Sequence, residues 1–191
     1  KKLSSRWQWA GSVVHDAIKQ LLTRARATGD FWPLERLLEQ TRQKSRVQFG
    51  ASRDKSYWRE PSRIVGLTEH EYGEPVADAE WKRLYEAVIE GSLRAFFQSE
   101  VLEEIRRTPR DRWLGVDELD HWFFEGTKIW VAVDFSYRDA DGRVHLLDWK
   151  TGKDRLKVPV GGTTAIKWGG DPKGFEAFEV PFKWDGYDWT L

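Results

Sequence analysis

The chain has 191 residues, of which 40% are hydrophobic, and its 31 basic residues balance its 31 acidic residues. This composition is typical of a globular chain and excludes a disordered one, and the zero net charge gives no overall attraction to nucleic acid. Cysteine is absent, which excludes disulfides, thiol catalysis, cysteine-held zinc and iron–sulfur clusters.

The sequence also suggests where the protein is located and whether the chain is a fragment. No apolar run is long enough for a membrane helix, and the first residues lack the apolar core of a signal peptide, so we expect a cytoplasmic protein with no membrane partner. Methionine is absent where about 2% is usual, which we interpret as a fragment or as missing segments. The twelve tryptophans are scattered, which favours packing over a carbohydrate site.

Helical periodicity dominates the first half of the chain. Apolar residues recur at helical spacing over 12–27, with Ser12 as the expected N-cap, and a second helix is expected near 32–44. Residues 45–80 are polar and rich in breakers, which predicts an irregular excursion. A long helix is then predicted over 79–107, capped by Asp78 and ended by Pro109.

The period changes to two after residue 112. Trp113–Val116 and His121–Phe124 have strand character, and the alternation over 129–137 predicts a strand with one apolar face. A turn at 139–142 leads into a partner strand over 144–149. Beyond Gly152 the pattern weakens, and short strands or extended coil are expected at 158–160, 165–168 and 175–184.

The turn fixes which side chains face one another. A three-residue loop, Ala140–Gly142, with Gly142 in the left-handed conformation pairs residue 139 with 143 and therefore sets Asp134 opposite Asp148. Carboxylates on opposed positions lie about 5 Å apart at Cβ and repel each other unless a cation lies between them. A different loop length would offset the pair by one residue.

Lys150 follows Asp148 by two positions and therefore points to the same face, whereas Trp149 points into the core. Two carboxylates and the Trp149 backbone carbonyl suit Mg²⁺ or Mn²⁺, which prefer oxygen ligands. A lysine beside such a metal can orient the attacking water and stabilise charge on a phosphodiester.

The run Val133-Asp134, then Asp148-Trp149-Lys150-Thr151-Gly152-Lys153, resembles the PD-(D/E)xK nuclease superfamily, more narrowly the RecB-like nuclease domains and their small CRISPR-associated relatives. The resemblance covers about 12–27 and 113–153. It implies that Asp134, Asp148 and Lys150 are catalytic, and that the histidine of Gly11-Ser12-Val13-Val14-His15 is a metal ligand beside Asp134, Asp148 and the Trp149 carbonyl. It also implies a restriction-endonuclease-like α/β fold with a central mixed sheet flanked by helices.

One family feature is missing from the sequence. RecB-like nucleases usually carry a Gln and Tyr motif on a helix soon after Lys-Thr-Gly, whereas no Gln follows Gln98 here, and 154–191 has no convincing helical pattern. Lys153 and Arg155 are candidate phosphate contacts just beyond the site.

Plainer readings stand beside these. The hairpin could carry an ordinary surface ion pair, His15 could be a structural helix residue, and Glu118 and Glu125 could be solvated turn residues rather than site residues. The arginines at 106, 107, 110 and 112 are better explained as cations at a helix C-terminus than as phosphate contacts. His70, His121 and His145 show no zinc spacing.

We therefore predict one domain over 1–191 that acts as a Mg²⁺- or Mn²⁺-dependent deoxyribonuclease. The resemblance implies an exonuclease-like role in DNA recombination and repair, or in phage or defence DNA processing, on single-stranded DNA or duplex ends, with a helicase or other recombination or defence protein as partner. The alternatives are a catalytically silent nuclease-like fold that binds DNA or protein, and an unrelated interaction domain whose tryptophans mark an interface.

Overall fold

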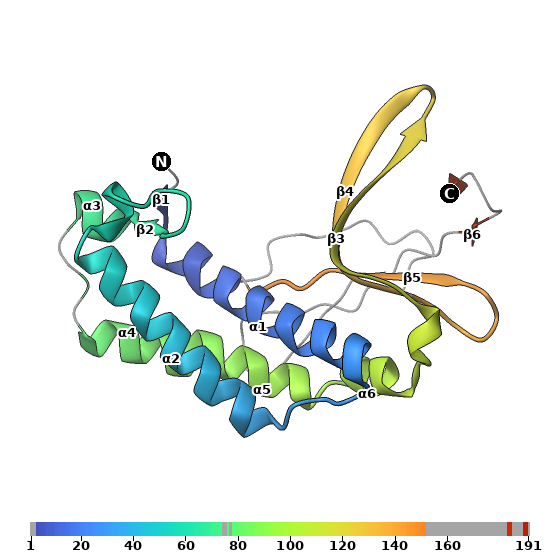
Figure 1. Cartoon of the computed structure of the whole chain (residues 1–191), viewed down its shortest axis with the longest axis horizontal. Coiled ribbons are helices and arrows are strands. Elements are labelled where there is room, and N and C mark those ends of the chain that lie inside the picture. Colours follow the sequence, from blue (N-terminus) through green and yellow to red (C-terminus); the bar gives the residue numbers. More distant parts are fainter. Residues whose placement is uncertain (1–2, 74–75, 77, 152–182, 185–188, 191) are drawn as a thin grey trace. The chain divides into compact units, whose positions relative to one another are not determined.

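The computed structural model describes residues 3–73, 76, 78–151, 183–184 and 189–190, and it is a mixed α/β structure of helices and small sheets (Figure 1). The chain divides into two compact units. The first unit comprises Lys1–Ile18 and Trp32–Phe97, and the second comprises Lys19–Phe31 and Gln98–Leu191. That the chain forms one domain over 1–191 stays a prediction. None of the described helices is both long enough and apolar enough to span a membrane.

Helix α1 (Arg6–Thr28) contributes residues to both units and begins earlier than expected. Its N-terminus is a capping box: the Gln8 backbone N–H donates to Ser5 Oγ at 3.2 Å, and the Ser5 N–H donates to Gln8 Oε1 at 3.1 Å. The prediction of Ser12 as the N-cap was wrong, since its hydroxyl donates to the Gln8 carbonyl inside the helix.

The first unit is mainly helical. It contains β1 (Leu3–Ser4), the first part of α1, α2 (Leu34–Arg53), the 3₁₀ turn η1 (Ser56–Trp58), β2 (Gly66–Leu67), α3 (Thr68–Tyr72), α4 (Asp78–Leu84), the π-helical segment η2 (Tyr85–Glu90) and α5 (Gly91–Phe97). Strands β1 and β2 pair in parallel. The irregular excursion predicted from residue 45 was wrong over part of its length, because α2 continues to Arg53 and α3 forms inside it.

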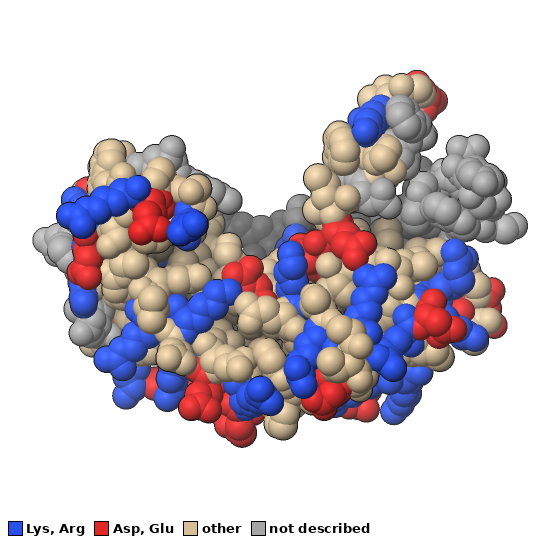
Figure 2. All heavy atoms as spheres, viewed as in Figure 1, with Lys and Arg blue, Asp and Glu red and all other residues tan. Residues whose placement is uncertain are grey.

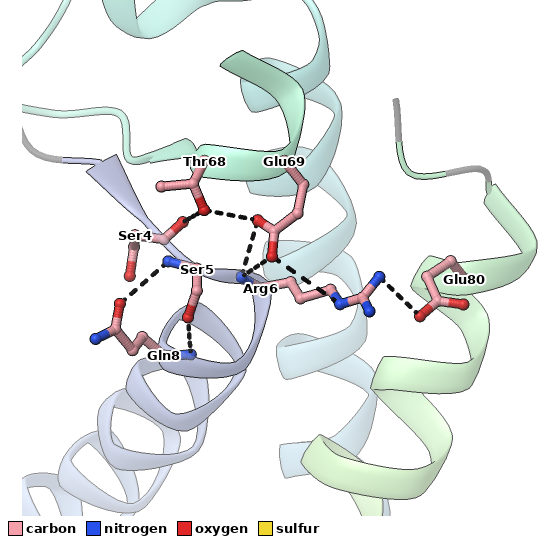
Figure 3. A network of polar contacts seen from close by, with 7 residues as sticks. All are labelled: Ser4, Ser5, Arg6, Gln8, Thr68, Glu69 and Glu80. Atoms are coloured by element: carbon pink, nitrogen blue, oxygen red, sulfur yellow. Dashed lines mark hydrogen bonds and ion pairs between the residues drawn. The ribbon is translucent and has the colours of Figure 1, made fainter. Parts of the chain in front are cut away.

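A polar network fastens α1 to the start of α3 and α4, as Figure 3 shows. The Arg6 backbone N–H points between the two oxygens of Glu69, 3.1 Å from each, and the Thr68 hydroxyl donates to Glu69 Oε2 at 3.1 Å. The Arg6 guanidinium reaches Glu80 Oε1 at 3.2 Å. A carboxylate from a distant segment thus caps the positive end of α1.

The predicted helix over 79–107 is interrupted. It ends with α5 at Phe97, and α6 (Glu100–Arg107) starts anew because Ser99 Oγ accepts the Leu102 N–H at 3.2 Å. A serine that caps a new first turn competes with continuation of the helix. Thr108 and Pro109 then end α6, as predicted.

The second unit contains the last part of α1, α6, the 3₁₀ turn η3 (Arg110–Arg112) and the strands β3 (Trp113–Phe124), β4 (Thr127–Arg138), β5 (Val144–Leu147), β6 (Lys183–Trp184) and β7 (Trp189–Thr190). Strands β3, β4 and β5 form an antiparallel sheet in chain order, and β6 pairs with β7. The large buried side chains of the second unit include Trp113, Phe135, Tyr137 and Trp149.

Strands β3 and β4 run on as a two-stranded ribbon past the point where β5 ends (Figure 1). Phe124 pairs with Thr127 around a two-residue turn in which Glu125 and Gly126 both have positive φ, 47° and 77°. That geometry is the hairpin turn whose twist matches the flanking strands. We call the ribbon formed by residues 118–133 the arm.

Candidate metal and nuclease site

The β4–β5 hairpin has the predicted turn. The Asp139 N–H donates to the Arg143 carbonyl at 2.9 Å, the Gly142 N–H donates to the Asp139 carbonyl at 3.3 Å, and Gly142 has φ +84°. The Asp139 carboxylate also accepts the Asp141 and Arg143 N–H groups, at 2.9 and 2.8 Å. These bonds confirm the three-residue loop with its glycine bulge.

The register that follows from this turn is also confirmed. Arg138 pairs with Val144, and Phe135 pairs with Leu147. The ladder ends at the Phe135–Leu147 pair, and the same register extended by one position would set Asp134 against Asp148. In that extension 134 and 148 would form a non-hydrogen-bonded pair, the kind in which facing side chains approach most closely.

The second strand ends earlier than predicted, at Leu147 rather than residue 149. In a continued ladder the Trp149 N–H would donate to the backbone of β4, but it donates instead to Asp134 Oδ2 at 2.5 Å. This bond takes the place of the next backbone hydrogen bond between β4 and β5. It fixes the Asp134 carboxylate beside the chain segment that contains Asp148. The Trp149 side chain is buried, as predicted.

Lys150 lies on the side of Asp148. Its Nζ is 2.5 Å from Asp148 Oδ2, and the Lys150 and Asp148 side chains are 55% and 40% exposed. Solvent can therefore reach both groups, and an exposed ion pair of this kind contributes little stability. The hairpin thus brings together Asp134, Asp148, Lys150 and the Trp149 backbone.

Within this group, the carboxyl of Asp148 has a shifted pKa. Burial raises the pKa of the Asp148 carboxyl, the Lys150 ammonium opposes that effect, and the nearby Asp134 carboxyl raises the pKa again, so that the net direction is upward. An added cation would favour the ionised form of Asp148 and so oppose this upward shift.

The sequence analysis missed Asp117. Val116 pairs with Phe135 and Glu118 pairs with Val133, so Asp117 stands opposite Asp134 on the other side of β4. Its backbone is left-handed, with φ 48°, and its carboxylate forms an ion pair with Lys19 of α1. The β3–β4 turn would have revealed the position, because the same register that pairs 124 with 127 sets 117 against 134.

Glu118 next to it is also held by α1. Its Oε1 lies 2.8 Å from Arg26 Nη1, and Arg26 also donates to the Leu114 carbonyl at 3.3 Å. Consecutive strand residues normally face opposite sides, and the left-handed Asp117 lets both acidic residues meet the same helix. Glu118 therefore has a structural role, whereas Glu125 lies in the turn of the arm.

The other predicted site residues fall outside this group. His15 is a half-buried residue of α1 in the first unit, and its role as a ligand stays a prediction. Lys153 and Arg155 lie outside the described residues, as do the strands suggested at 158–160 and 165–168 and most of 175–184. Within the described ranges, no group of three or more His, Asp or Glu side chains is placed to hold a metal.

The remaining charged and histidine residues have local partners. Arg106 pairs with Glu103 at 2.8 Å, and Arg110 donates to the Arg26 carbonyl near the end of α1 at 3.3 Å, which agrees with cations at helix C-termini. His145 Nε2 lies 2.9 Å from Asp139 Oδ2. Figure 2 shows basic and acidic side chains interspersed over the face that it draws.

Comparison with known proteins gives no family: no protein-family model, no curated protein and no solved structure matches this chain.

Proposed function

We propose that the chain is a Mg²⁺- or Mn²⁺-dependent deoxyribonuclease that hydrolyses phosphodiester bonds at Asp134, Asp148 and Lys150. The observation that supports the proposal is the geometry at the end of the hairpin, where Asp134 accepts the Trp149 N–H and Lys150 pairs with Asp148. The motif resemblance supplies the reaction class, and the mixed α/β structure is compatible with the finer proposal of a restriction-endonuclease-like fold.

The residues fit a hard divalent cation. Asp134 and Asp148 offer carboxylate oxygens, and burial together with the nearby Asp134 carboxyl raises the pKa of Asp148, so a dication would offset a cost of ionisation that is already present. The Trp149 carbonyl is the further ligand that we propose, with water completing the shell. When bound, the metal would supply Lewis acidity and lower the pKa of a coordinated water.

The protein's own groups have separate roles in this proposal. The Trp149 N–H holds Asp134 Oδ2 and so fixes the direction of that carboxylate. Lys150 donates to Asp148 in the resting protein, and its ammonium would turn to the scissile phosphate or the attacking water when substrate binds. The proposed substrate is DNA, with a helicase or another recombination or defence protein as partner.

A catalytically silent nuclease-like fold is the second candidate, and one observation favours it. Lys150 already forms a short ion pair with Asp148, and the Trp149 N–H already binds Asp134, so the hairpin is partly compensated without a metal. The absence of a Gln after Gln98 points the same way. This candidate predicts binding of DNA or protein without cleavage.

A chelator-controlled cleavage assay separates the two candidates. We expect the chain to degrade linear single-stranded or duplex DNA with Mn²⁺ or Mg²⁺ and to stop in EDTA. Asp134→Asn, Asp148→Asn and Lys150→Ala should each lower the rate by roughly 10³-fold, which corresponds to several kcal/mol of lost transition-state stabilisation.

Asp141→Asn is the matched control, because Asp141 is an exposed acidic residue in the loop of the same hairpin. It should cleave at the wild-type rate. Wild-type protein that leaves every DNA intact at millimolar Mn²⁺, or cleavage that survives in Asp148→Asn, would contradict the proposed activity.

A further inference from the structure

The arm carries large apolar side chains that are exposed to solvent. Leu119 is 65% exposed and Trp130 is 56% exposed, although both lie in regular paired strands. A two-stranded ribbon alone is only marginally stable in water, so large apolar side chains left in solvent on it are costly. In Figure 2 the described side chains of the arm are mostly uncharged, with a basic and an acidic side chain toward its tip.

Strand alternation connects this face with the candidate site. Lys128, Trp130, Ala132 and Asp134 occupy alternate positions of β4 and therefore share one side of the ribbon. Trp130 is about 13 Å along the strand from Asp134, given a rise of about 3.3 Å per residue. The exposed face thus continues to the carboxylate that we propose as a metal ligand.

Three groups on this face form one cluster. Trp130 pairs across the ribbon with His121, with ring centroids 5.0 Å apart. The Lys128 ammonium lies 4.1 Å from the centroid of the Trp130 ring. Aromatic rings combined with a cation are what proteins use to stack and hold unpaired bases.

We propose that this face, formed by His121, Lys128 and Trp130, is a stacking platform for the bases of single-stranded DNA, which it leads toward Asp134 and Asp148. The inference rests on the proposed nuclease function and narrows its substrate to unpaired strands or frayed ends. A duplex hides the flat faces of its bases in the helix stack, whereas a single strand exposes them to Trp130.

The charges on the arm predict how DNA binding there depends on salt concentration. Lys128 is the only lysine or arginine in 118–133, and Glu118 is paired with Arg26. Few phosphates would therefore be neutralised on the arm, so stacking must supply most of the affinity there. We expect the part of the affinity that depends on Trp130 to change little with salt concentration.

The test measures binding without cleavage. Fluorescence anisotropy of a labelled oligo(dT) in EDTA should give a Kd that rises roughly 5- to 100-fold in Trp130→Ala, the range expected for one lost base-stacking contact. Trp130→Phe should recover most of the affinity, and a blunt hairpin duplex should bind more weakly than oligo(dT). Trp58→Ala is the control, because Trp58 is 59% exposed and belongs to the first unit.

The outcomes separate this inference from the proposed function. Metal-dependent cleavage together with equal oligo(dT) binding by wild type and Trp130→Ala would overturn the platform and keep the nuclease. Trp130-dependent binding without any cleavage would support the platform and overturn the nuclease. Wild-type protein that does not bind oligo(dT) would overturn the platform and assign the exposed face to a protein partner.

Discussion

Two carboxylate clusters in this chain are formed by the same kinds of contact but have different roles. In the first unit, Glu69 accepts the Arg6 N–H, and Arg6 and Arg83 stand against Glu69 and Glu80. In the second unit, Asp134 accepts the Trp149 N–H, and Lys150 forms an ion pair with Asp148. The first cluster fastens a helix, whereas in the second the pKa of Asp148 is raised by burial and by the nearby Asp134 carboxyl.

This difference gives a physical criterion for function. A carboxylate that caps a helix and meets its own cation contributes to folding and needs nothing more. A carboxylate with a raised pKa, such as Asp148, costs stability in the free protein when it is ionised, and a site of this kind is typical of a place where a ligand supplies compensating charge. Parallel substitutions in the two clusters test whether their roles differ in this way.

The largest expected effect is stabilisation by metal. Mn²⁺ at about 100 times its Kd should raise the free energy of unfolding by about 2.7 kcal/mol, because it binds only the folded hairpin. Asp148→Asn should abolish this gain. Differential scanning fluorimetry with and without EDTA measures the Mn²⁺ stabilisation in wild type and in Asp148→Asn. An identical Mn²⁺ response in the two proteins would show that the second cluster does not bind the metal.

In metal-free buffer at neutral pH, the same Asp148→Asn variant should melt at a higher temperature than wild type. The folded-state pKa of Asp148 is raised, so its contribution to stability is present below the unfolded pKa and is lost as the pH rises through the folded value. At neutral pH the ionised carboxylate therefore costs stability, and the neutral amide does not.

Glu69→Gln should have the opposite effect at an intermediate size. The loss of the charged cap should destabilise the fold by about 1–2 kcal/mol, since the Arg6 N–H and guanidinium lose their anion. Urea unfolding measures the change. The Mn²⁺ response should be unaltered, and a variant that loses this response would show that the two clusters are coupled.

The smallest expected effect concerns His70, a buried group of the first unit. Its Nδ1 lies 2.8 Å from Ser52 Oγ, and Ser52 Oγ also accepts the Leu67 N–H at 2.8 Å. Burial lowers the pKa of His70, Glu69 opposes that effect, and Arg53 lowers the pKa further. The unfolded chain therefore binds the proton more readily, and stability should fall as the pH drops below about 6.5.

Urea unfolding of wild type and His70→Gln at pH 7.5 and pH 5.5 measures this term. The glutamine variant should lose less stability than wild type between the two pH values, because it has no group to protonate at this position. Equal losses in the two proteins would show that His70 does not contribute to the acid sensitivity of the fold.

The candidate site was largely predictable because its determinants are local. Gly142 after Asp141 selects the loop, the loop sets the register, and alternation then fixes the sides of Asp148, Trp149 and Lys150. The helix over 12–27 and the strands near 113 and 129 followed from periodicity in the same way.

The features that were missed depend on distant partners or on competition between local signals. The left-handed Asp117 is held by an ion pair with Lys19, which is far away in sequence. Part of the cap on α1 comes from the distant Glu69, and the break at Ser99 was hidden by a periodic apolar stripe that continues across it. The early end of β5 arises because a side chain replaces a backbone acceptor.

The most direct test of the account is anomalous diffraction from crystals soaked in Mn²⁺. The account predicts one manganese peak between the Asp134 and Asp148 carboxylates, with the Trp149 carbonyl facing it, and no such peak in Asp148→Asn. Crystals at millimolar Mn²⁺ in which no ion lies there and the two carboxylates point apart would contradict it.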